Sequence, residues 1–267
     1  MHALLNVAVM AARRAGAVLT RKLVRLETLK VEQKGYNDFV SDADRAAERA
    51  VIDVIHKHYP DHAILAEESG PQGADDSATL WIIDPLDGTT NFLHGFPVFA
   101  VSIGVQVAGR LEHGVVYDPL RQELFTASRG AGAQLDDRKI RVSGRTDMQR
   151  ALIGTGFPYR LEDQDTGPYL DMLGKVIRHT SGVRRPGAAA LDLAYVAAGR
   201  LDGFWETGLA PWDVAAGSLL IREAGGIVSG LDGSEDFIHS KHLLCGTPRI
   251  YRGLAKLCAR EIKAILP

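Results

Sequence analysis

Two aspartates stand at the end of an apolar run in the segment 81–90, whose sequence is WIIDPLDGTT. A carboxylate at the edge of a core is costly unless a cation or another partner neutralises it. Carboxylate oxygens are preferred ligands of Mg²⁺, which often binds beside substrate phosphates. The backbone amides of Gly88 and Thr89, in the turn after Asp84 and Asp87, could hold a phosphate as helix N-termini do. The pattern favours metal-assisted phosphate chemistry.

Other acidic residues follow apolar segments elsewhere in the chain. Glu67 closes the apolar run 63–66, and Asp213 follows Trp212. An isolated Asp-x-x-Asp is usually a solvated turn, but here it follows a buried run and has these further acids to meet. Asp213 could instead cap a helix, which is a common use of aspartate. Asp44 could likewise cap a helix that begins near residue 41, and a cap is compatible with a catalytic role.

Together these segments resemble the inositol monophosphatase family of metal-dependent phosphatases, and most closely its bacterial SuhB-type members, from about residue 2 to about residue 255. The Asp-Pro-Leu-Asp-Gly-Thr-Thr and Trp-Asp blocks are both long and specific. The resemblance implies an α/β fold, a layered α/β/α/β/α sandwich of the inositol monophosphatase and fructose-1,6-bisphosphatase type. A mostly antiparallel sheet is expected in the first half and a mixed sheet in the second, with the site between them.

The resemblance also implies roles for individual residues. One Mg²⁺ is expected at Glu67, Asp84 and the Leu86 carbonyl, a second at Asp84, Asp87 and Asp213, and a third, weaker one near Glu67, giving two to three ions per site. Asp44 and Thr89 match the pair that activates a metal-bound water, Glu67 is a further catalytic group, and Glu68 is expected to be a surface or supporting acid. Substrate contacts are implied for Asp87, Gly88, Thr89, Gly187, Ala189, Glu206 and Asp213.

Two positions depart from the family pattern and leave the substrate open. Ala188 stands where many relatives have a hydroxyl residue, and the segment 34–38 is one residue shorter than in animal members. Glu206 could also be an ordinary acid at a strand end. The metal core does not distinguish inositol phosphatases from relatives that act on fructose bisphosphate, 3′-phosphoadenosine, histidinol phosphate or NADP. The segment 192–199 and the Phe157-Pro158 turn favour the inositol phosphatase assignment.

The function that the resemblance implies is Mg²⁺-dependent hydrolysis of inositol 1-phosphate and related polyol and sugar phosphates, with lithium as an inhibitor. An alternative comes from a different class of function. SuhB-type proteins are associated with transcription antitermination through Nus factors and RNA polymerase, so the phosphatase activity could be dispensable. A homodimer is the family norm.

The composition of the chain limits the kinds of partner and the cellular location that we expect. The chain has 267 residues and a net charge of −2, so neither strong direct nucleic-acid binding nor attraction to an anionic membrane is expected. Two cysteines, Cys245 and Cys258, make no disulfide framework, which favours the cytoplasm. The first twelve residues are apolar but precede Arg13 and Arg14, the wrong order for a secretory signal. No run of eighteen apolar residues exists, so we expect no membrane span.

A chain of this length can form one large domain or two closely packed halves, and the resemblance implies a single domain over residues 1–267. Turn-rich sequence near 145–150 marks a weak internal boundary. We expect helices over 3–24, 41–59, 164–178, 188–198, 211–224 and 248–264. We expect strands over 63–66, 79–84, 100–107, 111–117, 123–127, 151–157, 201–206, 227–228 and 242–245, and a hairpin within 130–145.

Overall fold

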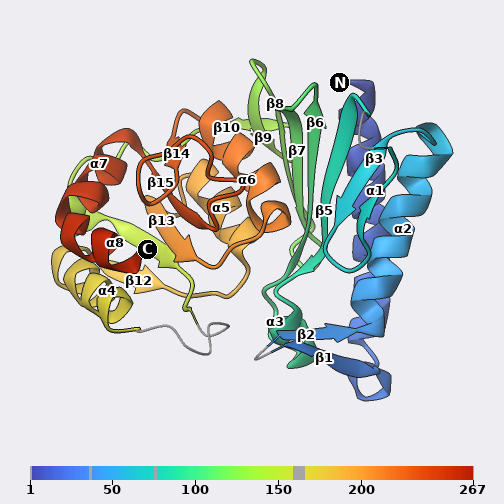
Figure 1. Ribbon diagram of the computed structural model, residues 1–267, viewed down its shortest axis with the longest axis horizontal. Helices are drawn as coiled ribbons and strands as arrows, with labels where there is room; N and C mark the ends of the chain where they lie inside the picture. Colours follow the sequence, from blue (N-terminus) through green and yellow to red (C-terminus); the bar gives the residue numbers. More distant parts are fainter. Residues whose placement is uncertain (1, 36–37, 75–76, 159–165, 267) are drawn as a thin grey trace.

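The computed structural model describes residues 2–35, 38–74, 77–158 and 166–266. Five layers lie side by side in Figure 1: two helices, a large sheet, two helices, a small sheet and an outer group of helices. The layered α/β/α/β/α fold implied by the sequence is therefore confirmed. Tyr36 and Asn37, within the shortened segment 34–38, lie outside the described residues.

The first half of the chain forms the large sheet and the helices that cover its outer face. Helices α1 (Ala3–Leu23) and α2 (Asp42–His58) pack on this face (Figure 1). The described strands run in the order β10 (Arg138–Ile140), β9 (Gly132–Leu135), β8 (Glu123–Ser128), β7 (Arg110–Asp118), β6 (Ala100–Val107), β5 (Thr79–Asp87), β3 (Ala63–Ala66) and β4 (Gly70–Gln72). Among these described strands the pair β3 and β5 is parallel and the other neighbouring pairs are antiparallel.

The second half forms the small mixed sheet and the remaining helices. Its described strands run in the order β12 (Gly182–Arg184), β11 (Leu152–Thr155), β13 (Gly203–Thr207), β15 (His242–Gly246) and β14 (Ile227–Ser229). Helices α5 (Ala189–Ala197) and α6 (Pro211–Glu223) lie between the two sheets. Helices α4 (Gly167–His179), α7 (Pro248–Leu257) and α8 (Ala259–Ile265) form the outermost layer (Figure 1).

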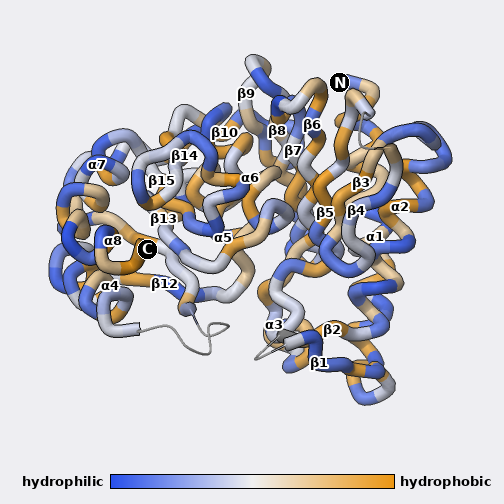
Figure 2. The backbone as a smooth tube through the Cα atoms, viewed as in Figure 1, coloured by the Kyte–Doolittle hydropathy of each residue, from blue (hydrophilic) through white to orange (hydrophobic). Residues whose placement is uncertain are grey.

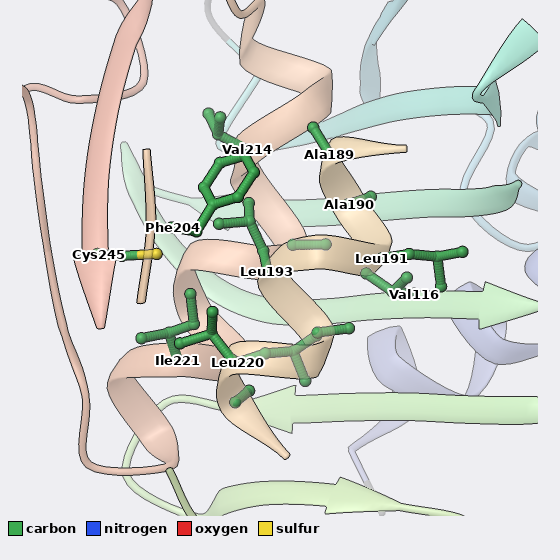
Figure 3. Packing of buried hydrophobic residues seen from close by; sticks show 14 of the residues in the cluster. Val116, Ala189, Ala190, Leu191, Leu193, Phe204, Val214, Leu220, Ile221 and Cys245 are labelled. Carbon is green, nitrogen blue, oxygen red and sulfur yellow. The ribbon is translucent and has the colours of Figure 1, made fainter. Parts of the chain in front are cut away.

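The middle layer is densely packed because its helices are rich in small and branched apolar residues. Figure 3 shows Leu193 and Leu191 of α5 beside Phe204 of β13 and Val116 of β7, so α5 contacts both sheets. A Cβ at Gly217 of α6 would lie 2.5 Å from Leu193, so this helix crossing requires glycine. In Figure 2 the orange, apolar positions follow the interfaces between layers. The two sheets are therefore held at a fixed spacing.

Helix α1 is long and apolar enough to span a membrane, by length and composition alone. Half of its apolar window is buried inside the protein, where Ala8, Ala15 and Leu19 are fully covered. Its apolar residues recur at helical spacing and face α2 and the sheet. We interpret α1 as a core helix.

Most predicted elements are confirmed, but several boundaries and short elements differ. The predicted helix over 248–264 is wrong, because Cys258, with φ −104° and ψ 11°, separates α7 from α8. Strand β5 continues three residues beyond the predicted 79–84. The sequence did not predict the hairpin of β1 (Val31–Gly35) and β2 (Asp38–Ser41), the edge strands β4 and β12, or the short helix α3 (Thr89–Leu93).

Candidate active site

Strand β5 places two of the predicted ligands in the interior. Asp84 and Asp87 are 2% and 7% exposed, and the pairing of β5 with β6 shifts register between them. Asp84 Oδ1 accepts a 2.9 Å hydrogen bond from the Leu86 amide, which fixes the irregular turn around Pro85. The acids are therefore held inside the molecule rather than at the surface of a solvated turn.

The third predicted ligand comes from the other half of the chain. Asp213 lies in the first turn of α6, and its Oδ2 accepts a 2.7 Å hydrogen bond from the Ala210 amide. One carboxylate oxygen from each of Asp84, Asp87 and Asp213 lies within 4.8 Å of the other two. Ala210 precedes the helix as its N-cap, so Asp213 is not itself the N-cap that the alternative interpretation proposed. The fold brings these three acids together from β5 and α6.

Glu67 borders this group but also contacts a cation. Its side chain hydrogen-bonds Asp84, and the Lys34 ammonium lies 3.3 Å from its Oε1. The same ammonium is 2.8 Å from Glu68 Oε1. The Glu68 side chain is only 5% exposed, and its backbone amide donates to Glu48, so it is a buried supporting acid rather than a surface one. Lys34 therefore supplies positive charge at one edge of the acidic group.

The carboxylates strongly perturb one another's protonation. Burial, followed by the charges of Glu67, Asp87 and Asp213, raises the pKa of Asp84 well above its usual value. Burial and then Asp213 raise the pKa of Asp87 to about 7, against hydrogen bonds from the amides of Ala190 and Ala189 that lower it. Burial also raises the pKa of Glu67, although Lys34 opposes it. A bound cation would relieve this mutual repulsion.

The predicted activating pair is in contact. Thr89 Oγ1 lies 2.9 Å from Asp44 Oδ1 and 3.1 Å from the Leu86 carbonyl oxygen. The other oxygen of Asp44 accepts hydrogen bonds from the Ser41 amide and hydroxyl, at 2.8 and 2.6 Å. Asp44 is thus both part of the N-terminal cap of α2 and the partner of Thr89.

A pocket lies beside the acids and contains most of the predicted substrate contacts. Its lining includes Asp87, Gly88, Gly187, Ala189, Glu206 and Asp213. The Ala189 amide is bonded to Asp87, so it helps to hold that carboxylate. The Glu206 carboxylate lies directly over Gly156, where any Cβ would overlap it. Leu86, Thr89 and Asp44 lie at the edge of the acidic group rather than among the residues that line this pocket.

Two features of the site were not predicted from the sequence. Asn91 Nδ2 lies 2.8 Å from the Val98 carbonyl and 2.9 Å from that of Pro186, which ties the turn after β5 to the loop before α5. Its position four residues after Asp87, in the same block, was the available signal. The contacts of Lys34 had no such signal because they link residues 33 and 34 positions apart.

A larger cavity among the described residues lies elsewhere. It measures about 940 Å³ and is bounded by the N-terminal end of α1 and the ends of β7, β8 and β9. Its lining includes one carboxylate, Glu112, which is paired with Arg110 and Arg129. Among the described residues, the three-carboxylate group lies beside the smaller pocket. The three-carboxylate group, rather than the volume of a cavity, therefore indicates the site.

The fold is that of a layered α/β protein, and a group of three carboxylates lies between its large and small sheets. The sequence model of the inositol monophosphatase family matches residues 1–264, and the chain belongs to that family. It is 52% identical to the Nus factor SuhB of Pseudomonas aeruginosa, over 95% of each chain. It is 49% identical to the inositol-1-monophosphatase of Mesorhizobium japonicum, over 98% of each chain. The crystal structure of the extragenic suppressor protein suhB from Bartonella henselae superposes with a TM-score of 0.94, at 46% identity, covering 97% of this chain and 99% of that one.

Proposed function

We propose that this protein is a Mg²⁺-dependent phosphatase that hydrolyses inositol 1-phosphate and related polyol and sugar phosphates. The observation that carries the proposal is the convergence of Asp84, Asp87 and Asp213 beside the pocket. Membership of a family of metal-dependent phosphatases supports the reaction class. The similarity to an inositol-1-monophosphatase supports the choice of substrate.

The residues of the site fit the proposed metal. The donors are all oxygens. Burial, together with the neighbouring acids, raises the pKa values of Asp84 and Asp87, so a divalent cation would stabilise their charged forms. Two to three Mg²⁺ ions would be held by Glu67, Asp84, the Leu86 carbonyl, Asp87 and Asp213. When bound, Mg²⁺ supplies positive charge that activates water and stabilises the leaving oxygen.

Thr89 and Asp44 are proposed to accept the proton that the attacking water loses. The Thr89 hydroxyl lies 2.9 Å from Asp44 Oδ1, and an ionised carboxylate can only accept a hydrogen bond. Thr89 therefore donates its own hydrogen to Asp44 and presents its lone pairs as acceptors. A water beside Thr89 would be oriented with a hydrogen toward this oxygen. As the water attacked phosphorus, its proton would pass to Thr89 while the Thr89 hydrogen passed to Asp44.

The substrate is proposed to bind across both halves of the molecule. The backbone amides of Gly88 and Thr89, at the start of the short helix α3, are proposed to bind the phosphate. The carboxylate of Glu206, on β13, is proposed to accept a hydrogen bond from a hydroxyl group of a polyol. Gly187, Ala189, Asp87 and Asp213 line the same pocket. The combination selects a compact, hydroxyl-rich phosphate monoester.

The test is phosphate release from inositol 1-phosphate with and without Mg²⁺, for the wild type and Asp87→Asn. A panel adds fructose 1,6-bisphosphate, 3′-phosphoadenosine 5′-phosphate and histidinol phosphate. We expect Mg²⁺-dependent turnover that is highest on inositol 1-phosphate, inhibited by Li⁺ and lost in the variant. If another compound were the preferred substrate, the proposed substrate would change but the proposed reaction would stand. No turnover on any of the four compounds would reject the phosphatase proposal.

A second proposed function is a role in transcription antitermination, with Nus factors and RNA polymerase as partners. Its specific support is that a relative 52% identical over nearly the whole chain is a Nus factor. The two functions separate with Asp87→Asn expressed in a deletion strain. Full rescue by the inactive variant would make the binding role sufficient, whereas failure to rescue would tie the biological role to hydrolysis.

We propose the remaining assembly features on family grounds. The chain is expected to act in the cytoplasm as a homodimer, without strong direct binding to nucleic acid. We also propose that residues 1–267 form one domain. The last strand of the large sheet ends at Ile140 and the first strand of the small sheet starts at Leu152, while α5 and α6 pack against both sheets.

A further inference from the structure

The N-terminal segment has a charge distribution unlike that of the whole chain. The chain carries a net charge of −2, yet its first acidic residue is Glu27. Helix α1 contains Arg13, Arg14, Arg21 and Lys22, and Arg25 lies two residues beyond its end. The first 26 residues therefore carry five basic and no acidic side chains, which the net charge of the whole chain does not reveal.

Most of these cations lie in solvent. Lys22 pairs with Asp42 at 2.5 Å, and the Arg13 guanidinium lies over the Tyr117 ring, 5.5 Å from its centre. Arg14, Arg21 and Arg25 are exposed, and within the described ranges no carboxylate lies at ion-pair distance from any of them. Their charge is therefore available to an external partner.

An apolar column runs along the same exposed side of the helix. Its members are Ala3, Met10, Ala17 and Val24, which recur every seven residues and are all exposed. Met10 is 44% exposed and Val24 is 81% exposed. Seven residues are almost two helical turns, so these side chains form a line about 30 Å long. Arg14 and Arg21 each stand three or four residues from two members of the column, which places them beside it.

The buried face of α1 argues against a membrane as the occupant. An interfacial helix inserts its apolar face among lipid chains. The apolar face of α1, including Leu5, Ala8, Ala12 and Leu19, is already packed against α2 and the large sheet. In Figure 1 this helix lies in the outer layer beside α2. What remains exposed is a narrow column bordered by arginines.

The same features argue against nucleic acid and against a second copy of the chain. A phosphate backbone would use the arginines, but it gains nothing from an apolar side chain every seventh residue. Helix α1 also contains no aromatic residue on which bases could stack. A two-fold contact with a second copy would place this basic face against another basic face, because α1 contains no acidic residue, and like charges repel. A helix with apolar residues at the same spacing and acidic flanks satisfies both features.

We propose that this face of α1, defined by Ala3, Met10, Ala17 and Val24 with Arg14 and Arg21, docks an acidic amphipathic helix of a partner protein. The proposal is independent of the phosphatase reaction, because none of these residues belongs to the acidic group or its pocket. The arginines set orientation and association rate, and the apolar column supplies the dehydrated contact.

The test uses fluorescence anisotropy of a labelled synthetic peptide of 24 residues, with leucine at the apolar heptad positions and glutamate beside them, at physiological ionic strength. We expect saturable binding to the full-length wild type and at least a tenfold weaker affinity for Arg14→Glu/Arg21→Glu. The variant Met10→Glu should weaken binding without changing an arginine. Unchanged thermal unfolding and phosphatase activity of each variant would show that the fold is intact.

The matched control variant is Arg249→Glu/Arg252→Glu on α7, because both arginines are exposed and, in the described structure, lack an ion pair. It should bind the peptide within twofold of the wild type. Equal weakening by this variant, equal binding of a scrambled acidic peptide, or no binding would overturn the proposal. Tighter binding of a 20-nucleotide oligouridine or of phosphatidylserine vesicles, lost in Arg14→Glu/Arg21→Glu, would overturn it in favour of that other partner.

Discussion

At the scale of single residues, the central feature is a group of buried acids that is unstable in isolation. Asp84 and Asp87 are almost inaccessible, and Asp213 and Glu67 approach them. Burial and the neighbouring acids raise the pKa values of Asp84, Asp87 and Glu67, because uncompensated buried charge is costly. Thr89 and Asp44 differ, because hydrogen bonds already satisfy both. The proposal therefore gives metal binding to the mutually repelling acids and proton transfer to the hydrogen-bonded pair.

Replacing the Thr89 hydroxyl tests the proposed proton path. Thr89→Val removes the hydrogen bond to Asp44 but keeps the side-chain volume, and a positioned proton acceptor contributes about 10²–10⁴-fold to rate. We expect kcat to fall within that range, with Mg²⁺ affinity by calorimetry unchanged. Thr89→Ser is the control and should retain most of the activity. A Thr89→Val enzyme with near wild-type kcat would assign the proton to another group.

The acids also predict how the stability of the metal-free protein depends on pH. The folded-state pKa of Asp87 is about 7, against a reference of 3.8, so the folded protein binds a proton that the unfolded chain releases. The resulting stability is fully present below about pH 4 and is lost as the pH rises through about 7. In EDTA, the wild-type melting temperature should therefore fall from pH 5 to pH 8.

Asp87→Asn is the matched control for this pH effect, because it removes the titrating group and keeps the shape of the side chain. Its melting temperature should fall less over the same interval in differential scanning calorimetry. The remaining slope comes from the raised pKa values of Asp84, Glu67 and Glu68. Identical slopes for the two proteins would contradict the assignment of a shifted proton to Asp87.

At the scale of elements, the site depends on tight turns at the ends of β5 and before α5. Gly88 has φ +89°, and a Cβ there would lie 2.9 Å from the Val98 carbonyl oxygen. Asn91 bridges the same carbonyl to Pro186. The positive φ and the nearby carbonyl oxygen therefore both require glycine at position 88. Its geometry controls where Asp87 and Thr89 point.

Gly88→Ala should destabilise the protein by about 1–3 kcal/mol, because it combines an unfavourable backbone conformation with a steric clash. Gly109→Ala is the matched control, since Gly109 has φ +76° but no atom within 4 Å of an added Cβ. Urea unfolding should show a larger loss for Gly88→Ala than for Gly109→Ala. Equal losses would mean that the neighbouring loop yields without cost.

Long periodic elements could be predicted from the sequence, and short exposed ones could not. The helix that begins after Ser41 has a capping signal and an apolar face, and the structure confirms it as α2. Strand β1 was missed because all five of its residues are exposed and its sequence does not alternate. The break at Cys258 has no glycine or proline to mark it. Local periodicity predicts an element only where one face is buried.

The candidate site was predictable as a set of residues but not as an arrangement. The blocks around Asp84 and Asp213 indicated acids, yet their separation along the chain gives no distance between them. Their approach follows from the packing of α6 on the large sheet. The contact of Lys34 with Glu67 and Glu68 depends on the β1–β2 hairpin, which the sequence did not predict. Long-range contacts therefore had to come from the structure.

At the scale of the whole molecule, the two halves meet at the acids. Asp84 and Asp87 belong to the large sheet, Asp213 starts α6, and Glu206 belongs to β13 of the small sheet. A cation held by the first three residues would link β5 to α6. A ligand that binds the folded state at a hundred times its dissociation constant stabilises it by about 2.7 kcal/mol. That stabilisation should extend to both halves of the chain.

Hydrogen exchange measured by mass spectrometry tests this coupling. Saturating Mg²⁺ should slow exchange around the turn 84–93 and also at the N-terminal turns of α5 and α6, because Asp87 bonds the amides of Ala190 and Ala189 and Asp213 bonds that of Ala210. In Asp213→Asn the protection should remain near 84–93 and decrease at α6. Asp53→Asn, an exposed acid on α2, is the control and should behave as the wild type. Protection confined to one half of the wild-type chain would show that the cation does not join the two halves.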